Sequence, residues 1–270
     1  MNILIGDIGN TITKLCLVDT KKLKINKVNY LNSKIIYSKK ELIKILEKII
    51  KKKKINKISL FSSVVPKYNK ILQSVLKKKY KIKLVEIKDK RLNKIVKINI
   101  KKENQVGSDR IANAAGVYKK YRENCIVLDF GTATTFDVVT KMGIYNGGII
   151  APGINLSIKS LIISADQIPV FLLKKQKKII GKNTVEALRS GFYWGYIGLI
   201  NNIILKIENE TKKKYKVIFT GGYANLFRTS IIRPFAVDRN ITITGIIEIF
   251  KKNKNILIKW KKKKNLFFAH

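Results

Sequence analysis

Two segments of the chain each place an aspartate at the end of an apolar stretch, directly before a glycine-containing turn. They are Ile5-Gly6-Asp7-Ile8-Gly9-Asn10-Thr11 and Leu128-Asp129-Phe130-Gly131-Thr132-Ala133-Thr134-Thr135. Such turns expose backbone N–H groups and hydroxyls that can surround phosphate oxygens. The carboxylate can hold Mg²⁺, which selects oxygen ligands. Taken alone, the first segment is equally an ordinary hairpin turn with a capping aspartate. The repeated layout favours two loops that hold the phosphate chain of one nucleotide.

A third segment, Thr220-Gly221-Gly222-Tyr223-Ala224, places two glycines between an apolar stretch and a helical pattern. Glycines allow the backbone to approach a flat ligand such as adenine or its ribose, although a plain strand-to-helix turn would have the same composition. The chain has no Gly-x-x-x-x-Gly-Lys-Ser/Thr phosphate loop. The order of the three loops resembles that of actin, sugar kinases and heat-shock chaperones.

The segment Gly107-Ser108-Asp109-Arg110 combines an acid with an arginine. The acid can accept the proton of a hydroxyl nucleophile, and the guanidinium offers a carboxylate a fork of donors. The only histidine is His270, so any general base has to be a carboxylate. The alternative is a helix N-terminus that Ser108 or Asp109 caps, with Arg110 in a surface ion pair.

Hydrophobic periodicity predicts the elements that position these segments. We expect strands over 2–7, 12–19, 58–64, 83–87, 125–130, 134–139, 143–150 and 216–220, and helices over 39–50, 68–79, 109–121, 152–164, 183–208, 223–230 and 244–251. Both halves open with a strand, an aspartate, a turn and a second strand. This similarity predicts an α/β fold of two ribonuclease-H-like lobes, each a mixed sheet flanked by helices, with a nucleotide cleft between them. The expected division is 1–115, 116–252 and a basic tail, 253–270, to which we assign no function.

The charge balance is strongly basic, with 57 Lys+Arg against 17 Asp+Glu in 270 residues and a net charge of +40. A balance of this kind raises nucleic acid or an anionic membrane as a partner. The excess is mostly lysine spread along the chain among isoleucine and asparagine, three residues with AT-rich codons. Arginine, the residue that makes bidentate contacts to phosphate and guanine, is sparse. We therefore expect neither a nucleic-acid nor a membrane partner.

Other features indicate the cytoplasm. The two cysteines, Cys16 and Cys125, have no metal-ligand spacing, which is typical of thiols in a reducing compartment. The first residues lack the cationic start of a signal peptide. No apolar run approaches the roughly 20 residues of a spanning helix.

Taken in order, several motifs resemble those of type III pantothenate kinases, from residue 2 to about residue 250. The most specific is Asp129-Phe130-Gly131-Thr132-Ala133-Thr134-Thr135. The others are Asp7-Ile8-Gly9-Asn10-Thr11, Ser62-Ser63-Val64-Val65-Pro66, Gly107-Ser108-Asp109-Arg110, Gly147-Gly148-Ile149-Ile150-Ala151-Pro152-Gly153, Gly181-Lys182-Asn183-Thr184 and Thr220-Gly221-Gly222.

The resemblance implies ATP-dependent phosphorylation of pantothenate to 4′-phosphopantothenate, the first step of coenzyme A synthesis, by a homodimer. It implies that Asp109 is the catalytic proton acceptor and that Arg110 pairs with the substrate carboxylate. Mg²⁺ would be held with ATP by Asp7, and a monovalent cation, K⁺ or NH₄⁺, by Asp129. The implied ATP contacts are Asp7, Ile8, Gly9, Asn10, Thr11, Ile12, Thr13, Lys14 and Thr132, to which the glycine argument adds Gly221 and Gly222. The implied pantothenate contacts are Ile100, Gly107, Ser108, Asp109, Arg110 and Thr184.

The chain departs from the family pattern before Gly107. Ile100 stands where a tyrosine is usual and Glu103 where a proline is usual. Without this aromatic side chain, the affinity for pantothenate and the identity of the substrate are open, whereas the phosphate loops are unaffected. Two alternatives therefore stay open: a kinase for another small carboxylated alcohol, and a nucleotide-binding accessory or regulatory protein without enzymatic activity.

Overall fold

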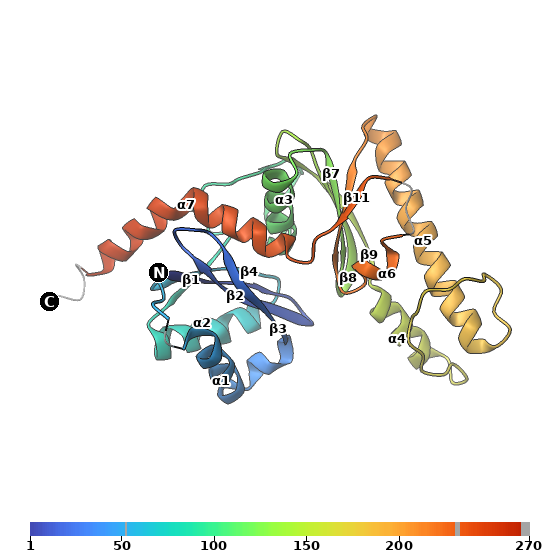
Figure 1. Cartoon of the computed structure of the whole chain (residues 1–270), viewed down its shortest axis with the longest axis horizontal. Coiled ribbons are helices and arrows are strands. Elements are labelled where there is room, and N and C mark those ends of the chain that lie inside the picture. Colours follow the sequence, from blue (N-terminus) through green and yellow to red (C-terminus); the bar gives the residue numbers. More distant parts are fainter. Residues whose placement is uncertain (52, 230–232, 266–270) are drawn as a thin grey trace. The chain divides into compact units, whose positions relative to one another are not determined.

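The protein divides into two compact units in a computed structural model that describes residues 1–51, 53–229 and 233–265 (Figure 1). Unit 1 combines Met1–Lys120 with the segment that begins at Asn240, and unit 2 is Tyr121–Arg239. The chain thus returns to unit 1 at its C-terminal end, whereas the division expected from the sequence is contiguous. The reason is the last helix, which packs on the sheet of unit 1.

Unit 1 has a five-stranded sheet in the order β3-β2-β1-β4-β5. Strand β1 (Asn2–Ile8) is antiparallel to β2 (Ile12–Asp19), which is antiparallel to β3 (Ile25–Asn32). Strand β4 (Ile58–Ser63) runs parallel to β1, and β5 (Lys83–Glu86) runs parallel to β4. The carboxyl ends of three parallel strands therefore share one edge of the sheet, where ligands bind in open α/β sheets.

Side chains alternate between the two faces of this sheet, and helices cover both faces. Leu4 and Ile8 face helices α1 (Lys39–Ile50) and α2 (Pro66–Tyr80). Ile3 and Ile5 face α3 (Ser108–Lys120) and α7 (Ile241–Asn265). The remaining elements of unit 1 are short: η1 (Ser33–Tyr37), β6 (Lys97–Ile98) and η2 (Glu103–Gln105).

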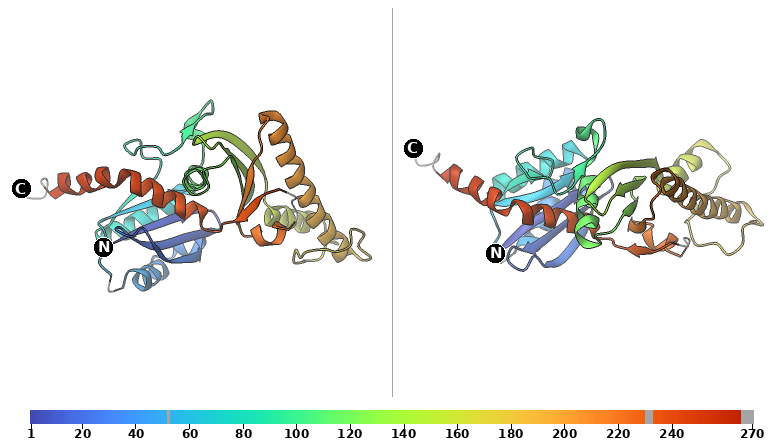
Figure 2. Two further views of the ribbon diagram at one scale, coloured as in Figure 1. Left: turned by 45° about the horizontal axis from the view of Figure 1, so that its top comes forward. Right: turned by 90° about the horizontal axis from the view of Figure 1, so that it is seen from above.

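Helices α3 and α7 lie side by side because glycines let their backbones approach (Figure 2). A β-carbon on Gly245 would stand 1.7 Å from the Ala112 carbonyl oxygen, and one on Gly116 would stand 2.5 Å from the Ile241 carbonyl oxygen. Because no side chain fits at these two positions, glycine is required there. The close packing holds α7 in unit 1.

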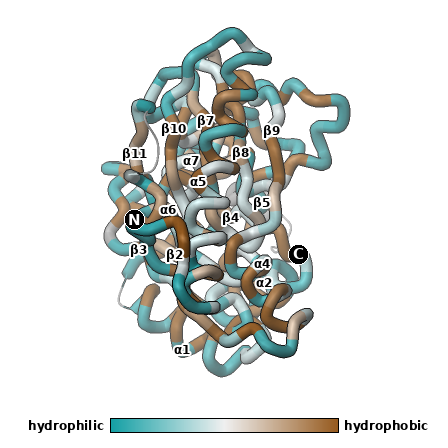
Figure 3. Tube along the Cα trace, turned by 90° about the vertical axis from the view of Figure 1, so that its right-hand side faces the viewer, coloured by the Kyte–Doolittle hydropathy of each residue, from teal (hydrophilic) through white to brown (hydrophobic). Residues whose placement is uncertain are grey.

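Unit 2 contains the strand order β11-β10-β7-β8-β9. Its strands are β7 (Cys125–Phe130), β8 (Ala133–Val139), β9 (Ile144–Pro152), β10 (Lys216–Gly221) and β11 (Phe235–Val237), and its helices are α4 (Ile154–Ser164), α5 (Thr184–Thr211) and α6 (Ala224–Phe227). Strands β7 and β10 are parallel, while β8 and β9 are antiparallel additions. The core includes Phe130, Phe219 and Phe227, and the hydrophobic part of strand β10 is its middle, 217–219, between Lys216 and Thr220 (Figure 3).

The mixed α/β class predicted from the sequence is confirmed in both units. The structure extends the last helix from the expected 244–251 to Ile241–Asn265, and it shortens the helix expected over 223–230 to α6, with Ser230 outside the described residues. His270 and the end of the basic tail, 266–270, also lie outside them. Among the described helices, none combines the length and apolarity that crossing a membrane requires.

Candidate functional site

The first predicted phosphate loop is the tip of the β1–β2 hairpin. The Gly9 N–H donates to the Ile12 carbonyl at 3.1 Å and closes the turn. Ser33 secures the tip from the neighbouring strand end: its hydroxyl donates to the Gly9 carbonyl at 2.7 Å, and its N–H donates to the Thr11 carbonyl at 2.9 Å. Asn10 stays exposed at the tip. These hydrogen bonds hold the backbone of the loop in place, and its tip presents polar groups to solvent.

Asp7 and Lys14 face each other at the base of this hairpin, where they are paired in the strand register. The Lys14 Nζ lies 3.9 Å from Asp7 Oδ2, and Asp7 is 8% exposed. This distance is at the limit of an ion pair. A carboxylate is the kind of group that binds Mg²⁺, and an ammonium is the kind that binds a phosphate oxygen, so both types stand at the base of the predicted phosphate loop. Of the other predicted contacts here, Ile8 and Thr13 are buried and Ile12 is exposed.

The Gly107–Arg110 segment forms the start of helix α3, and Ser108 anchors it to strand β4. The Ser108 hydroxyl accepts from the Ser63 N–H at 2.8 Å and donates to the Ser63 carbonyl at 2.8 Å. The Ser62 hydroxyl donates to the Ser108 hydroxyl oxygen at 3.2 Å. Ser108 is 1% exposed, so these bonds are sheltered from water.

Asp109 folds back over the turn that precedes it. Its Oδ1 accepts from the Arg110 N–H at 2.8 Å and lies 2.4 Å from where a β-carbon on Gly107 would stand. Glycine is therefore the residue that leaves room for the carboxylate. An acid in the first turn of a helix also faces the positive end of the helix dipole.

Unit 1 brings its two predicted segments to one edge of the sheet. Asp7 pairs with Ser62 in the parallel register of β1 and β4, and Ser62 is hydrogen-bonded to Ser108. One residue of β4 therefore separates the Asp7 hairpin from the start of the helix that carries Asp109. Two of the predicted acids, Asp7 and Asp109, therefore belong to elements that meet at one edge of the unit 1 sheet.

Unit 2 brings the other two predicted loops together. Asp129 pairs with Thr220, and Phe130 with Gly221, in the parallel register of β7 and β10. Gly221 has φ +84°, and a β-carbon there would stand 2.6 Å from Asp129 Oδ1. The Gly222 N–H donates to the Phe130 carbonyl at 3.0 Å. The Asp129 loop and the double-glycine loop thus form one continuous surface.

Thr132 lies at the tip of the β7–β8 turn, supported by the end of strand β9. A β-carbon on Gly153 would stand 2.2 Å from the Thr132 carbonyl oxygen. The preceding residue, Pro152, accepts a hydrogen bond of 2.8 Å from the Tyr196 hydroxyl on α5. The segment Ala151–Gly153 therefore packs behind the turn at Gly131-Thr132 and holds it against the core of unit 2.

The surroundings of Asp129 suit a cation with oxygen ligands. The adjacent Thr220 hydroxyl is buried, and its oxygen has no hydrogen-bond partner among the described residues. The glycine at 221 leaves room for the Asp129 carboxylate beside this hydroxyl. Within the described ranges, three or more His, Cys, Asp or Glu side chains nowhere gather in a way that could hold a metal. Any ion here would complete its shell with backbone or substrate oxygens, as Mg²⁺ commonly does.

Two predicted substrate contacts lie outside these loops. Ile100 is half-buried in the segment between β6 and η2 of unit 1. Thr184 is exposed as the first residue of α5 in unit 2, where Asn183 caps the helix by accepting from the Glu186 N–H at 2.9 Å.

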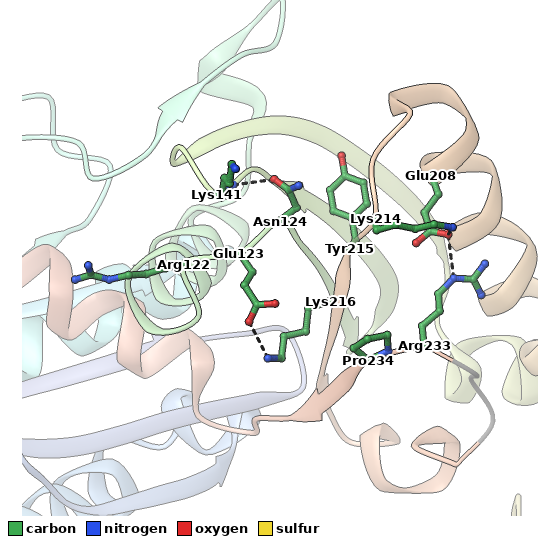
Figure 4. A pocket seen from close by; sticks show the side chains of 10 residues that line it. All are labelled: Arg122, Glu123, Asn124, Lys141, Glu208, Lys214, Tyr215, Lys216, Arg233 and Pro234. Carbon is green, nitrogen blue, oxygen red and sulfur yellow. Dashed lines mark hydrogen bonds and ion pairs between the residues drawn. The ribbon is translucent and has the colours of Figure 1, made fainter.

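A surface hollow of about 570 Å³ in unit 2 is distinct from the predicted site (Figure 4). It lies at the amino ends of β7 and β10, opposite to the Asp129 turn, and Figure 4 labels its ten lining residues. Glu123 pairs with Lys216 at 2.9 Å, and Glu208 pairs with Arg233 at 3.1 Å. Ligands of α/β sheets bind at the carboxyl ends of the strands, so we assign the phosphate chemistry to the loops.

Two supporting residues were not predicted from the sequence: Ser33 and Tyr196. They act through hydrogen bonds between distant segments, which periodicity does not reveal.

Sequence comparisons relate the chain to known proteins. A family model described as type III pantothenate kinase matches residues 3–206. A type III pantothenate kinase of Pelagibacter ubique is 48% identical over 91% of this chain and 97% of its own length. One of Paramagnetospirillum magneticum is 37% identical over 72% of this chain and 75% of its own length.

Solved structures show the fold. A Baf family protein of Campylobacter jejuni superposes with a TM-score of 0.61 at 22% identity, over 94% of this chain and all of that one. MreB5 of Spiroplasma citri, bound to ADP, superposes with a TM-score of 0.52 at 12% identity, over 96% of this chain and 98% of that one. The fold is that of the actin-like ATPases.

Proposed function

This chain belongs to the type III pantothenate kinase family, and we propose that it transfers the γ-phosphate of ATP to the primary hydroxyl of pantothenate. The hydroxyl oxygen forms a bond to the γ-phosphorus as the bond to the ADP oxygen breaks, so the products are ADP and 4′-phosphopantothenate. This reaction is the first step of coenzyme A biosynthesis. The observation that carries the proposal is the shared edge of the unit 1 sheet, where Ser62 joins the Asp7 hairpin to the helix of Asp109.

In this reaction Asp109 accepts the proton of the attacking hydroxyl, and Arg110 pairs with the carboxylate of pantothenate. The backbone supports the first role, because the Arg110 N–H fixes the Asp109 carboxylate at the start of α3 and Gly107 leaves room for it. General-base assistance of this kind contributes about 10²- to 10⁴-fold in rate. We assign Gly107, Ser108, Ile100 and Thr184 to further contacts with pantothenate.

The phosphate chain of ATP is assigned to residues 7–14 of the first hairpin and to Thr132, Gly221 and Gly222. Lys14 and the backbone N–H groups of both turns supply positive charge and donors. Asp7 would hold Mg²⁺ with ATP, and Asp129 would hold a monovalent cation, K⁺ or NH₄⁺. Bound cations neutralise phosphate charge as it shifts toward the leaving oxygen.

We also propose that the protein acts as a homodimer through helix α5. Gly191, Gly195 and Gly198 lie on one exposed face of this helix, with open space where their β-carbons would stand. Exposed apolar side chains, among them Ile150 and Leu156, occur on neighbouring elements of unit 2. An exposed, glycine-lined helix face suits a second copy of the chain, since a two-fold axis sets the same face against itself.

A reducing compartment such as the cytoplasm fits the cysteines. Cys16 and Cys125 are buried free thiols, and burial raises the pKa of each to about 12. Such thiols stay protonated and react slowly with oxidants. This supports the proposed cytoplasmic location.

The test is a coupled assay for ADP release with ATP and Mg²⁺, with and without pantothenate, in K⁺, NH₄⁺ and Na⁺ buffers. We expect pantothenate-dependent ADP release and a product heavier by one phosphate in mass spectrometry. ADP release that other small carboxylated alcohols stimulate more than pantothenate would favour the alternative that Ile100 leaves open. No ADP release with any acceptor, despite ATP binding, would favour a nucleotide-binding accessory protein.

A further inference from the structure

A side-chain hydrogen bond joins two segments of unit 2 that lie 68 positions apart in the sequence: the Tyr223 hydroxyl donates to Asn155 Oδ1. Tyr223 directly follows Gly222 and is the N-cap residue of helix α6. Asn155 lies in the first turn of helix α4, two residues after Gly153. The bond therefore connects the double-glycine loop to the start of α4.

The two segments that this bond joins lie on either side of the turn that carries Thr132. On one side, Gly153 is packed so closely that a β-carbon there would stand 2.2 Å from the Thr132 carbonyl oxygen. On the other side, the Gly222 N–H donates to the carbonyl of Phe130, just before the turn, at 3.0 Å. The three segments thus form a closed ring of contacts, and the tyrosine–asparagine bond completes it.

The hydrophobic core anchors both helix starts from below. Ile154, the first residue of α4, is 1% exposed and belongs to the core of unit 2. At the end of α6, the Phe227 ring stacks on Phe130 with the ring centroids 5.4 Å apart. Asn155, in contrast, is exposed and Tyr223 is half-buried. Their bond therefore adds a second attachment, at the surface, to two segments that the core holds only from one side.

This ring contains the part of unit 2 to which we assign the phosphate chain of ATP. Thr132 belongs to the central turn, and Gly221 and Gly222 belong to one of the two flanking segments. Ligand-binding loops are drawn from the less stable parts of a structure, and ordering them on binding costs affinity. A bond that holds the loops in place before ATP arrives reduces this cost.

We propose that Tyr223 and Asn155 are positioning residues that hold the double-glycine loop and the Thr132 turn in the arrangement that binds ATP. The inference rests on the proposed assignment of the phosphate chain to these loops. Neither side chain is assigned a contact with the nucleotide, because both act through the backbone segments that they join. Loss of either one therefore weakens the binding of ATP and leaves the binding of pantothenate unchanged.

The experiment is a double-mutant cycle on the affinity for ATP. Tyr223→Phe removes only the donor hydroxyl, and Asn155→Ala removes the acceptor. Calorimetry with ATP and Mg²⁺, without pantothenate, measures the Kd of wild type, of each single variant and of the double variant. We expect each single change to raise the Kd about three- to tenfold, the size of one neutral hydrogen bond. Because both changes break the same bond, the double variant binds ATP no more weakly than either single variant.

Two control variants separate this bond from general effects of the substitutions. Tyr80→Phe removes a tyrosine hydroxyl in unit 1 that donates to the Ile43 carbonyl at 3.5 Å. Asn225→Ala removes an exposed asparagine side chain from α6 itself. Both controls keep the wild-type Kd. In the coupled assay, Tyr223→Phe and Asn155→Ala raise the KM for ATP but not the KM for pantothenate, a difference that a general loss of folded protein would not produce.

Amide hydrogen exchange in the ligand-free protein supplies a readout that does not depend on the reaction. We expect faster exchange at 131–133 and 221–222 in Tyr223→Phe, with the β1–β2 hairpin unchanged. Exchange equal to wild type at these residues, an unchanged Kd in the single variants, or effects that multiply in the double variant would each overturn the positioning role. A wild-type protein that binds ATP but does not phosphorylate pantothenate would overturn the proposed function alone, whereas one that does not bind ATP would overturn both.

Discussion

A β-carbon on Gly221 would lie 2.6 Å from the Asp129 Oδ1 atom. The two residues come from neighbouring parallel strands, β10 and β7, and Gly221 adopts φ +84°. The carboxylate therefore uses space that any other residue at 221 would fill. The double-glycine loop and the acidic loop depend on each other for their shape.

This dependence predicts the behaviour of Gly221→Ala. The substitution combines a positive φ, which costs about 1–2 kcal/mol, with displacement of the Asp129 carboxylate. We expect the KM for ATP to rise at least about tenfold, as for a misplaced binding group. Gly143→Ala is the matched control, because Gly143 has φ 74° in a turn outside the predicted site. Similar losses of stability in the two variants, with KM raised only in Gly221→Ala, would agree with the prediction; equal KM values would contradict it.

Replacing Asp109 with asparagine tests the proton acceptor. Asparagine keeps an oxygen that can accept from the Arg110 N–H, so the fold is retained, but it removes the base. We expect kcat to fall by about 10²- to 10⁴-fold while ATP binding measured by calorimetry stays the same. The control is Asp19→Asn, which makes the same chemical change at a turn where Asp19 accepts from the N–H groups of Lys21 and Lys22. Wild-type turnover in pure Asp109→Asn protein would exclude Asp109 from the mechanism.

Helix α7 should be intolerant of a side chain at position 245. A β-carbon there meets the Ala112 carbonyl oxygen at 1.7 Å, so Gly245→Ala forces α3 and α7 apart. We expect the free energy of unfolding to fall by about 1–3 kcal/mol, as for overpacking in a core. Urea titration measures it, with Asn255→Ala on the exposed face of α7 as the control. A Gly245→Ala protein as stable as that control would show that the two helices pack less closely than described.

Glu86 predicts a pH dependence of stability. Its pKa is raised above the ordinary value of 4.5, with burial as the largest cause. The folded protein therefore binds more protons than the unfolded chain between the two pKa values, so stability falls as pH rises through that window. Glu86→Gln has no such titration. We expect the difference in unfolding free energy between wild type and Glu86→Gln to shift in favour of the variant as pH rises above 4.5. If the difference in unfolding free energy between the two proteins does not change with pH, the pKa of Glu86 is not raised by folding.

The proposed dimer predicts that Gly195→Arg yields a monomer. The position is open within one protomer, so the substitution leaves the protomer folded and obstructs only a second copy. Sedimentation velocity measures the mass, and Glu210→Arg, on an exposed position near the end of the same helix, is the control. If the Gly195→Arg protein sediments as wild type does, the dimer interface is not at this face of α5.

The sequence predicts the strands and loops of the site well, because they depend on local patterns. The apolar stretch before Asp7 and the hydroxyl-rich turn after Asp129 are readable in a few residues. The return of α7 is not readable in this way: the 2.8 Å hydrogen bond between Thr242 and Asn113 joins residues 129 positions apart. The same applies to Ser33, whose bonds to Gly9 and Thr11 arise only when separate strands are placed side by side.

The return of α7 has a consequence for synthesis on the ribosome. Unit 2 is a continuous stretch of chain, so all of it is available to fold before translation ends. Unit 1 has to wait, because the face of its sheet that carries Ile3 and Ile5 is covered in part by the last helix to emerge. Until α7 emerges, this apolar face of the unit 1 sheet stays uncovered in the nascent protein. We therefore expect chaperones to bind mainly to the segment Met1–Lys120.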